Sequence, residues 1–120
     1  MKKILLLIGL LFISPFSYAE EPIDTYTARL GSEDHFNSDG SRLKSVGDII
    51  RQDRANYHKF NIRDAEDQSD SVFGDVESRG RIPTMLKRGY IDKVTQKSIL
   101  NSEPVVTVSI YNNRIEVYLQ

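Results

Sequence analysis

Residues 105–119 carry the pattern that most restricts the fold. Two runs in which apolar and polar residues alternate flank the dipeptide Asn112-Asn113. Such alternation is typical of strands that bury one face, and asparagine tolerates the positive φ that a type I′ hairpin turn requires. A two-residue turn pairs positions 110, 108 and 106 with 115, 117 and 119. All six residues are apolar and share one face, so the turn and the hydrophobic pattern predict the same register for this C-terminal β-hairpin: Val106, Val108, Ile110, Ile115, Val117 and Leu119.

The other face of the predicted hairpin is polar and aromatic. Tyrosine and arginine are enriched at the energetic centres of interfaces, because they lose water easily and still form hydrogen bonds. We therefore predict a binding surface on this face, made of Tyr111, Arg114, Glu116 and Tyr118. The alternative is an ordinary solvated face whose aromatic side chains stack for local stability.

The main helix is predicted over residues 41–60, with Ser38, Asp39 or Ser41 as its N-cap. At 100° per residue, its apolar side chains form one arc: Leu43, Val46, Ile49, Ile50, Tyr57 and Phe60. Asp53 projects into the centre of this arc, where a carboxylate must be paired or hydrogen bonded. Two kinds of partner are open for Asp53, a salt bridge, for which Arg54 at the edge of the arc is a candidate, or the main chain of a loop. His58 projects away from the arc and is predicted to be exposed.

Shorter elements complete the predicted domain. A short strand is predicted over residues 25–30, a turn-rich loop over 32–40, and short helices around 82–88 and after Asp92. The prediction is a single α+β domain over residues 20–120. One long helix packs on a small antiparallel sheet that contains the hairpin, with one or two short helices beside it.

The first 19 residues predict export. Lys2 and Lys3 supply a basic start, and the apolar run Ile4–Ile13 is long enough for a signal peptide but too short to span a bilayer. Small residues precede the expected cleavage after Ala19, which would leave the domain in the periplasm or outside the cell. No later segment is apolar enough to cross a membrane. The chain has no cysteine, which excludes a lipid-anchored lipoprotein and any disulfide.

Catalysis is the alternative to a binding function. A small hydrolase, metal-dependent or not, would use Asp53 with His35 or His58. No nucleophile-elbow sequence marks a serine, however, and a buried carboxylate is also typical of structural ion pairs. The net charge of −1 becomes −3 once Lys2 and Lys3 leave with the signal peptide, so no basic face for nucleic acid is predicted.

The loop before the main helix resembles a metal site only in part. Aligned on Gly40, residues 35, 37 and 39 occupy the first EF-hand ligand positions, but the twelfth position is Val46 instead of glutamate. The order of His35, Asn56 and His58 resembles that of ββα-metal nucleases, which have two strands before the helix where one is predicted here. We therefore expect no metal and no cofactor.

The stretch 63–78 is acidic, and the residues that follow it as far as Lys97 are basic. A loop this long in a compact domain is either functional or mobile. Three arrangements of these charges are open. The acidic and basic runs are two separate solvated surfaces, or they pair with each other, or they form a patch for a charged partner. Composition leaves these three possibilities open.

A resemblance rests on three groups of residues: Asp34-His35…Asn37-Ser38…Gly40…Arg42-Leu43, Gln52 to His58, and Asp64…Glu66-Asp67. Together, these residues resemble the pattern of a group of small exported proteobacterial proteins of unknown function. The resemblance covers most of the mature chain. The resemblance implies no activity, ligand or residue role. We expect a non-catalytic binding module, such as an inhibitor, an immunity-type protein or an envelope accessory protein. Its partner would be another envelope or extracellular protein, and its oligomeric state is left open.

Overall fold

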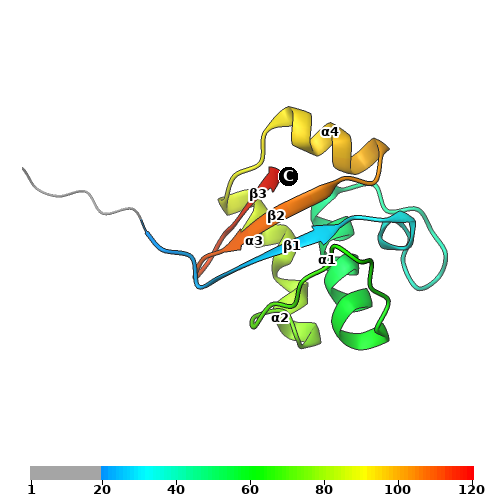
Figure 1. The fold of residues 1–120 in the computed structure, drawn as a ribbon, viewed down its shortest axis with the longest axis horizontal. Coiled ribbons are helices and arrows are strands. Elements are labelled where there is room, and N and C mark those ends of the chain that lie inside the picture. Colours follow the sequence, from blue (N-terminus) through cyan, green and yellow to red (C-terminus); the bar gives the residue numbers. More distant parts are fainter. Residues whose placement is uncertain (1–19) are drawn as a thin grey trace, which may run out of the picture.

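The computed structural model describes residues 20–120, and the predicted signal peptide lies outside these residues. Figure 1 shows helices packed on a small antiparallel sheet, so the predicted α+β fold is confirmed. The elements, of which η2 is a 3₁₀ helix and η3 a π-helix, are β1 Asp24–Arg29, η2 Ser32–His35, α1 Val46–Ala55, η3 Asn56–Phe60, α2 Val76–Gly80, α3 Ile82–Arg88, α4 Lys93–Asn101, β2 Val105–Ile110 and β3 Ile115–Leu119.

The sheet has the strand order β1-β2-β3, and both neighbouring pairs are antiparallel. The predicted hairpin register is confirmed, with the pairs Ile110–Ile115, Val108–Val117 and Val106–Leu119. The first strand pairs with the other side of β2, so Asp24 lies opposite Ile110 and Arg29 lies opposite Val105. The first strand of the domain, β1, is therefore held in the sheet by its hydrogen bonds to β2, which lies near the C-terminus.

Two details of the hairpin differ from the prediction. Asn61 is the one non-glycine residue with positive φ in the described part of the chain, so neither Asn112 nor Asn113 adopts the backbone of a type I′ turn. The Tyr111 N–H still donates to the Arg114 carbonyl at 2.9 Å, which closes the turn without positive φ. Leu119 was expected in the core but is 41% exposed, because it ends an edge strand.

The main helix begins five residues later than predicted, and Ser45 caps it by accepting a hydrogen bond from the Asp48 N–H. Residues 41–43 are extended instead: Phe36 bridges Arg42, and the Leu43 N–H donates to the His35 carbonyl at 2.8 Å. The prediction of Ser38, Asp39 or Ser41 as the cap was therefore wrong. The backbone contacts of residues 41–43 with residues 35 and 36 replace the helical hydrogen bonds that were predicted for them.

The second half of the predicted helix is a π-helix, which has i→i+5 hydrogen bonds and more residues per turn. Side chains after Ala55 therefore lag behind the α-helical phase. Phe60, predicted in the apolar arc, is 45% exposed, and His58, predicted to be exposed, turns inward and is largely buried. Asn61, with φ of 57°, ends the π-helix in the left-handed conformation.

The two short helices agree with the sequence. Pro83 lies in the first turn of α3, Gly89 caps its C-terminus, and the Asp92 carboxylate caps α4 by accepting from the Thr95 N–H at 2.7 Å. Figure 1 shows α1, α2 and α3 grouped together and α4 apart from them. One continuous core joins the helices to one face of the sheet, and its buried residues include Ala28, Leu30, Ile49, Ile50, Phe73, Ile82, Ile99, Val106, Val108, Ile110, Ile115 and Val117.

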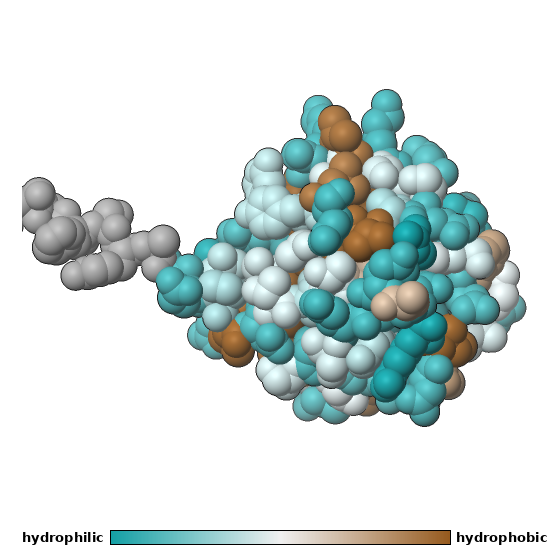
Figure 2. Space-filling view, viewed as in Figure 1, coloured by the Kyte–Doolittle hydropathy of each residue, from teal (hydrophilic) through white to brown (hydrophobic). Residues whose placement is uncertain are grey.

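The visible surface is mostly polar. Figure 2 shows the largest group of hydrophobic atoms over α4, whose Val94 is 68% exposed. Among residues 20–120, no helix combines the length and the apolar character needed to cross a membrane.

The acidic segment 63–78 closes the free edge of β1. The Gln68 N–H donates to the Thr27 carbonyl at 2.8 Å, and the Gln68 side chain accepts from the Thr27 N–H at 3.0 Å. One residue earlier, Asp67 Oδ1 accepts from the Arg29 N–H at 2.9 Å. Covered edges cannot pair with further strands, so the acidic segment has a structural role in the sheet.

Candidate functional site

Arg54 is the centre of a buried polar cluster beneath β1. Its side chain is completely buried, and its Nε donates to Asp53 Oδ2 at 2.8 Å, so of the two kinds of partner open for Asp53 the salt bridge is the one that forms. Its Nη1 donates to Asp70 Oδ1 at 2.9 Å. The guanidinium carbon also lies 3.9 Å from the centre of the Tyr26 ring and 4.7 Å from that of Tyr57. Nη2 has no hydrogen-bond partner in the described chain, and these two ring faces compensate for it.

Asp70 ties the acidic segment to this cluster. Its Oδ1 accepts from Arg54 and from His58 Nε2 at 2.7 Å, and its Oδ2 accepts from the N–H groups of Val72 and Phe73 at 2.9 and 2.6 Å. Burial acts to raise the pKa of Asp70, but these hydrogen bonds outweigh it and hold the pKa below its usual value. Asp70 is therefore a charged anchor with every acceptor site in use.

Asp34 and Asp53 are two buried carboxyl groups that influence each other's pKa. Asp34 accepts from the Asn56 amide at 2.8 Å and from the Gly31 N–H at 3.0 Å. Burial raises the pKa of Asp34 to about 6 in spite of these donors, and burial raises the pKa of Asp53 in the same direction. Two buried carboxyl groups that influence each other hold a proton more tightly than either holds it in water.

The three residues of the hydrolase hypothesis are not brought together. Asp53 is 2% exposed and bonds to Arg54, whereas His58 bonds to Asp70. His35 is buried, and its two ring nitrogens lie 2.7 Å from the carbonyl oxygens of Gly31 and Ile99. Carbonyl oxygens only accept hydrogen bonds. Both ring nitrogens of His35 therefore face main-chain carbonyl groups, and neither is directed at a space where a substrate or a metal could approach.

The predicted binding residues do lie together on the outer face of the sheet. Arg114 stacks on Tyr111, with its guanidinium carbon 3.9 Å from the ring centre, and its Nε donates to Glu116 at 3.2 Å. The Tyr118 hydroxyl donates to the other oxygen of Glu116 at 2.8 Å, and this hydrogen bond raises the pKa of Tyr118 to about 12. Tyr90, which the sequence did not single out, adds a fifth member, with its ring centre 5.7 Å from that of Tyr118. We call these five residues the tyrosine face.

Nothing among known proteins assigns a role to these residues, because neither a family model, a curated protein nor a solved structure matches the chain. Within residues 20–120, no three His, Asp or Glu side chains are grouped in a way that could hold a metal ion. The candidates that remain are therefore surfaces and buried charges, judged by their own geometry.

The Asp34–Asp53 pair predicts that stability falls as the pH rises from about 4 to 7. Each folded-state pKa is raised, so the folded protein binds the proton more tightly than the unfolded chain. That stabilisation is complete below the unfolded pKa near 4 and is lost as the pH passes through about 6. For Asp34 alone the loss amounts to about 3 kcal/mol. Asp70 acts in the opposite direction, because its pKa is lowered in the folded state, but its contribution is lost only as the pH falls toward its unfolded pKa near 4 and is nearly constant above pH 5.

Urea denaturation at pH 4.5, 5.5 and 7 measures this effect. Asp34→Asn should remove most of the decline in unfolding free energy, whereas Asp39→Asn, at an exposed position, should retain the wild-type slope. Equal slopes for wild type and Asp34→Asn would contradict the raised pKa of Asp34.

Proposed function

We propose that the protein is an exported, non-catalytic binding module whose partner is another protein of the envelope or the extracellular space. The observation that supports this function is the tyrosine face. Tyr90 and Tyr118 are exposed, and Tyr111 is held by its contact with Arg114. Rigid aromatic side chains beside charged groups lose little entropy on binding and resemble the centres of protein interfaces.

The internal contacts of this face favour a preformed surface over a flexible one. Glu116 accepts from both Arg114 and Tyr118, and Arg114 also donates to Glu20 at 2.8 Å. Each long side chain therefore has few rotamers left to lose when a partner binds. A partner that lays an apolar surface on the rings would leave these polar contacts intact.

The alternative function, a small hydrolase using Asp53 with His35 or His58, has weaker support. A general base needs an accessible lone pair within reach of the substrate. Asp53 is buried against Arg54, and both ring nitrogens of His35 contact carbonyl oxygens. These groups are already used to hold the fold.

A pull-down from periplasmic extract and culture medium tests the proposal. The variant Tyr111→Ala/Arg114→Ala/Glu116→Lys should lose the captured partner at least tenfold while its thermal midpoint changes little. A matched variant on the helical side replaces three exposed charges and should capture the partner as the wild type does: Glu77→Lys/Arg81→Ala/Lys87→Ala. Full capture by the first variant would show that the tyrosine face is not the binding surface.

A further inference from the structure

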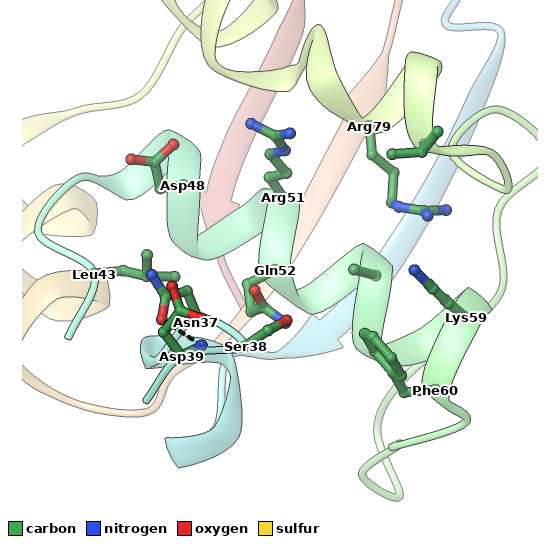
Figure 3. A pocket seen from close by; sticks show the side chains of 12 residues that line it. Asn37, Ser38, Asp39, Leu43, Asp48, Arg51, Gln52, Lys59, Phe60 and Arg79 are labelled. Atoms are coloured by element: carbon green, nitrogen blue, oxygen red, sulfur yellow. Dashed lines mark hydrogen bonds between the residues drawn. The ribbon is translucent and has the colours of Figure 1, made fainter. Parts of the chain in front are cut away.

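A groove with a volume of about 340 Å³ runs along α1 and η3 (Figure 3), and none of its lining residues belongs to the tyrosine face. The loop around residues 37–39 forms one wall and α2 forms the other. Its two acidic side chains lie at one end and two of its three basic side chains at the other, with Arg51 between them (Figure 3). Asp39 and Asp48 lie at the end beside Leu43, and Lys59 and Arg79 lie at the other end with Phe60 (Figure 3).

Arg79 is the unusual residue of this groove. It is only 5% exposed, and its Nη1 donates to the Phe73 carbonyl at 3.1 Å. No carboxylate of residues 20–120 lies within ion-pair distance of Arg79 or of Lys59. Glu77, the acid closest in sequence to Arg79, is exposed and forms no ion pair with it. Asp75 feels the charge of Arg79 only from beyond ion-pair distance, and its oxygens accept from the N–H and hydroxyl of Ser78. Buried charges are normally paired, so the protein leaves an arginine ready for an anion.

The geometry around Arg79 is that of an anion subsite. Figure 3 shows its guanidinium and the Lys59 ammonium directed toward one another across the groove. Two cations that converge without an acid between them repel each other, and an added carboxylate relieves that repulsion. Phe60 and Val76, both exposed, line the same end and offer apolar contact beside the anion.

The other parts of the groove suit a chain with polar groups along its length. Ser38 and Gln52 lie between the two charged ends (Figure 3), and Gln52 uses its amide N–H on Asn56 at 3.0 Å, which leaves its oxygen to accept. At about 1.5 Å per residue, the α-helical part from Asp48 to Ala55 spans roughly 10 Å, and the π-helical residues as far as Lys59, with a smaller rise per residue, lengthen it further. The whole stretch has the length of about five extended residues. Charge order, central hydrogen-bonding groups and length all match a peptide better than a single small anion.

We propose that this groove binds an extended segment of another polypeptide, with a carboxylate at Lys59 and Arg79 and a cationic side chain at Asp39 and Asp48. The groove and the tyrosine face share no residue, so an experiment can refute one of the two proposed binding sites without refuting the other. Specificity would come from charge order, because a segment with its charges reversed places like charges together at both ends.

Capped pentapeptides test this site on the exported protein. Four sets share random central residues and differ in their end charges: Lys…Glu, Glu…Lys, Lys…Lys and Glu…Glu. A groove has one backbone direction for its ligand, so one of the two mixed sets should bind at least tenfold better than Lys…Lys. Equal binding of all four sets, or binding of none, overturns the proposal. Binding of inorganic phosphate alone would reveal a free-anion site and also overturns it.

Substitutions of Lys59 and Arg79 test whether these two residues bind the carboxylate of the peptide. Lys59→Gln, at an exposed position, should lower the affinity of the preferred set at least tenfold, and Lys87→Gln should leave it unchanged. Arg79→Gln should lower it further, with a thermal melt to confirm that the variant is folded. Lys59→Glu should shift the preference toward Lys…Lys. An unchanged preference in both Lys59 variants refutes the anion subsite.

Discussion

Replacing Asp70 with alanine is expected to lower the free energy of unfolding by about 4 kcal/mol. The substitution leaves the buried guanidinium of Arg54 with Asp53 alone, whose pKa is raised, and leaves the N–H groups of Val72 and Phe73 without their acceptor. It also frees His58, which is anchored through the same oxygen. Loss of one partner from a buried charge network costs far more than the network gains by forming, because the remaining charge stays out of water.

Asp53→Ala provides the comparison for this result. It also removes a carboxylate from Arg54, but Arg54 keeps Asp70. Burial already raises the pKa of Asp53, so its negative charge is unfavourable in the folded state. We expect a loss of about 2 kcal/mol, measured by urea denaturation at pH 7. If Asp53→Ala is the more damaging of the two, Asp70 is not the principal anchor.

Gly89→Ala is expected to lower the free energy of unfolding by about 3 kcal/mol, because the added methyl group collides with the backbone of β3. A methyl group at Gly89 would lie 1.7 Å from the Ile115 carbonyl oxygen and 2.7 Å from its carbon. These are backbone atoms of β3 and cannot rotate away. The end of α3 would have to move off the strand, and the bridge between Tyr90 and Glu116 would open with it.

Gly74→Ala is the matched control, since a Cβ at Gly74 meets no atom within 4 Å. It should leave the thermal midpoint unchanged or raise it slightly, because alanine restricts the unfolded chain. A midpoint for Gly89→Ala within one degree or so of wild type would mean that α3 and β3 are not in close contact.

The parts of the fold that follow from local patterns were predictable. Alternation and turn length define the hairpin register without knowledge of any neighbour, and a cap residue such as Asp92 acts within its own helix. The need of Asp53 for a partner could also be predicted, since a carboxylate inside an apolar arc must be paired or hydrogen bonded, and Arg54 was one of the candidates. The prediction of which side chains of the main helix face the core is wrong only after Ala55, where a π-helix replaces the α-helix. No propensity rule separates these two kinds of helix.

Partners that are distant in sequence were not predictable. Asp70 belongs to an acidic run with no periodicity, yet it bonds to Arg54 and His58 on the main helix. Arg79 is one of many basic residues in its stretch, and only its burial distinguishes it. In both cases the deciding quantity is which charges are removed from water, and that depends on tertiary packing.

The pairing of Asp24 with Ile110 has a consequence for the order of folding. A chain made from its N-terminus presents β1 long before β2 exists, and the acidic segment cannot close an edge that has not yet formed. Local helices such as α3 and α4 can form early, but the sheet must wait for the last residues. Folds dominated by contacts between distant residues form slowly, in milliseconds to seconds. The polypeptide therefore remains without its sheet until synthesis is nearly complete, and a truncation that removes β3 would leave β2 paired with β1 alone.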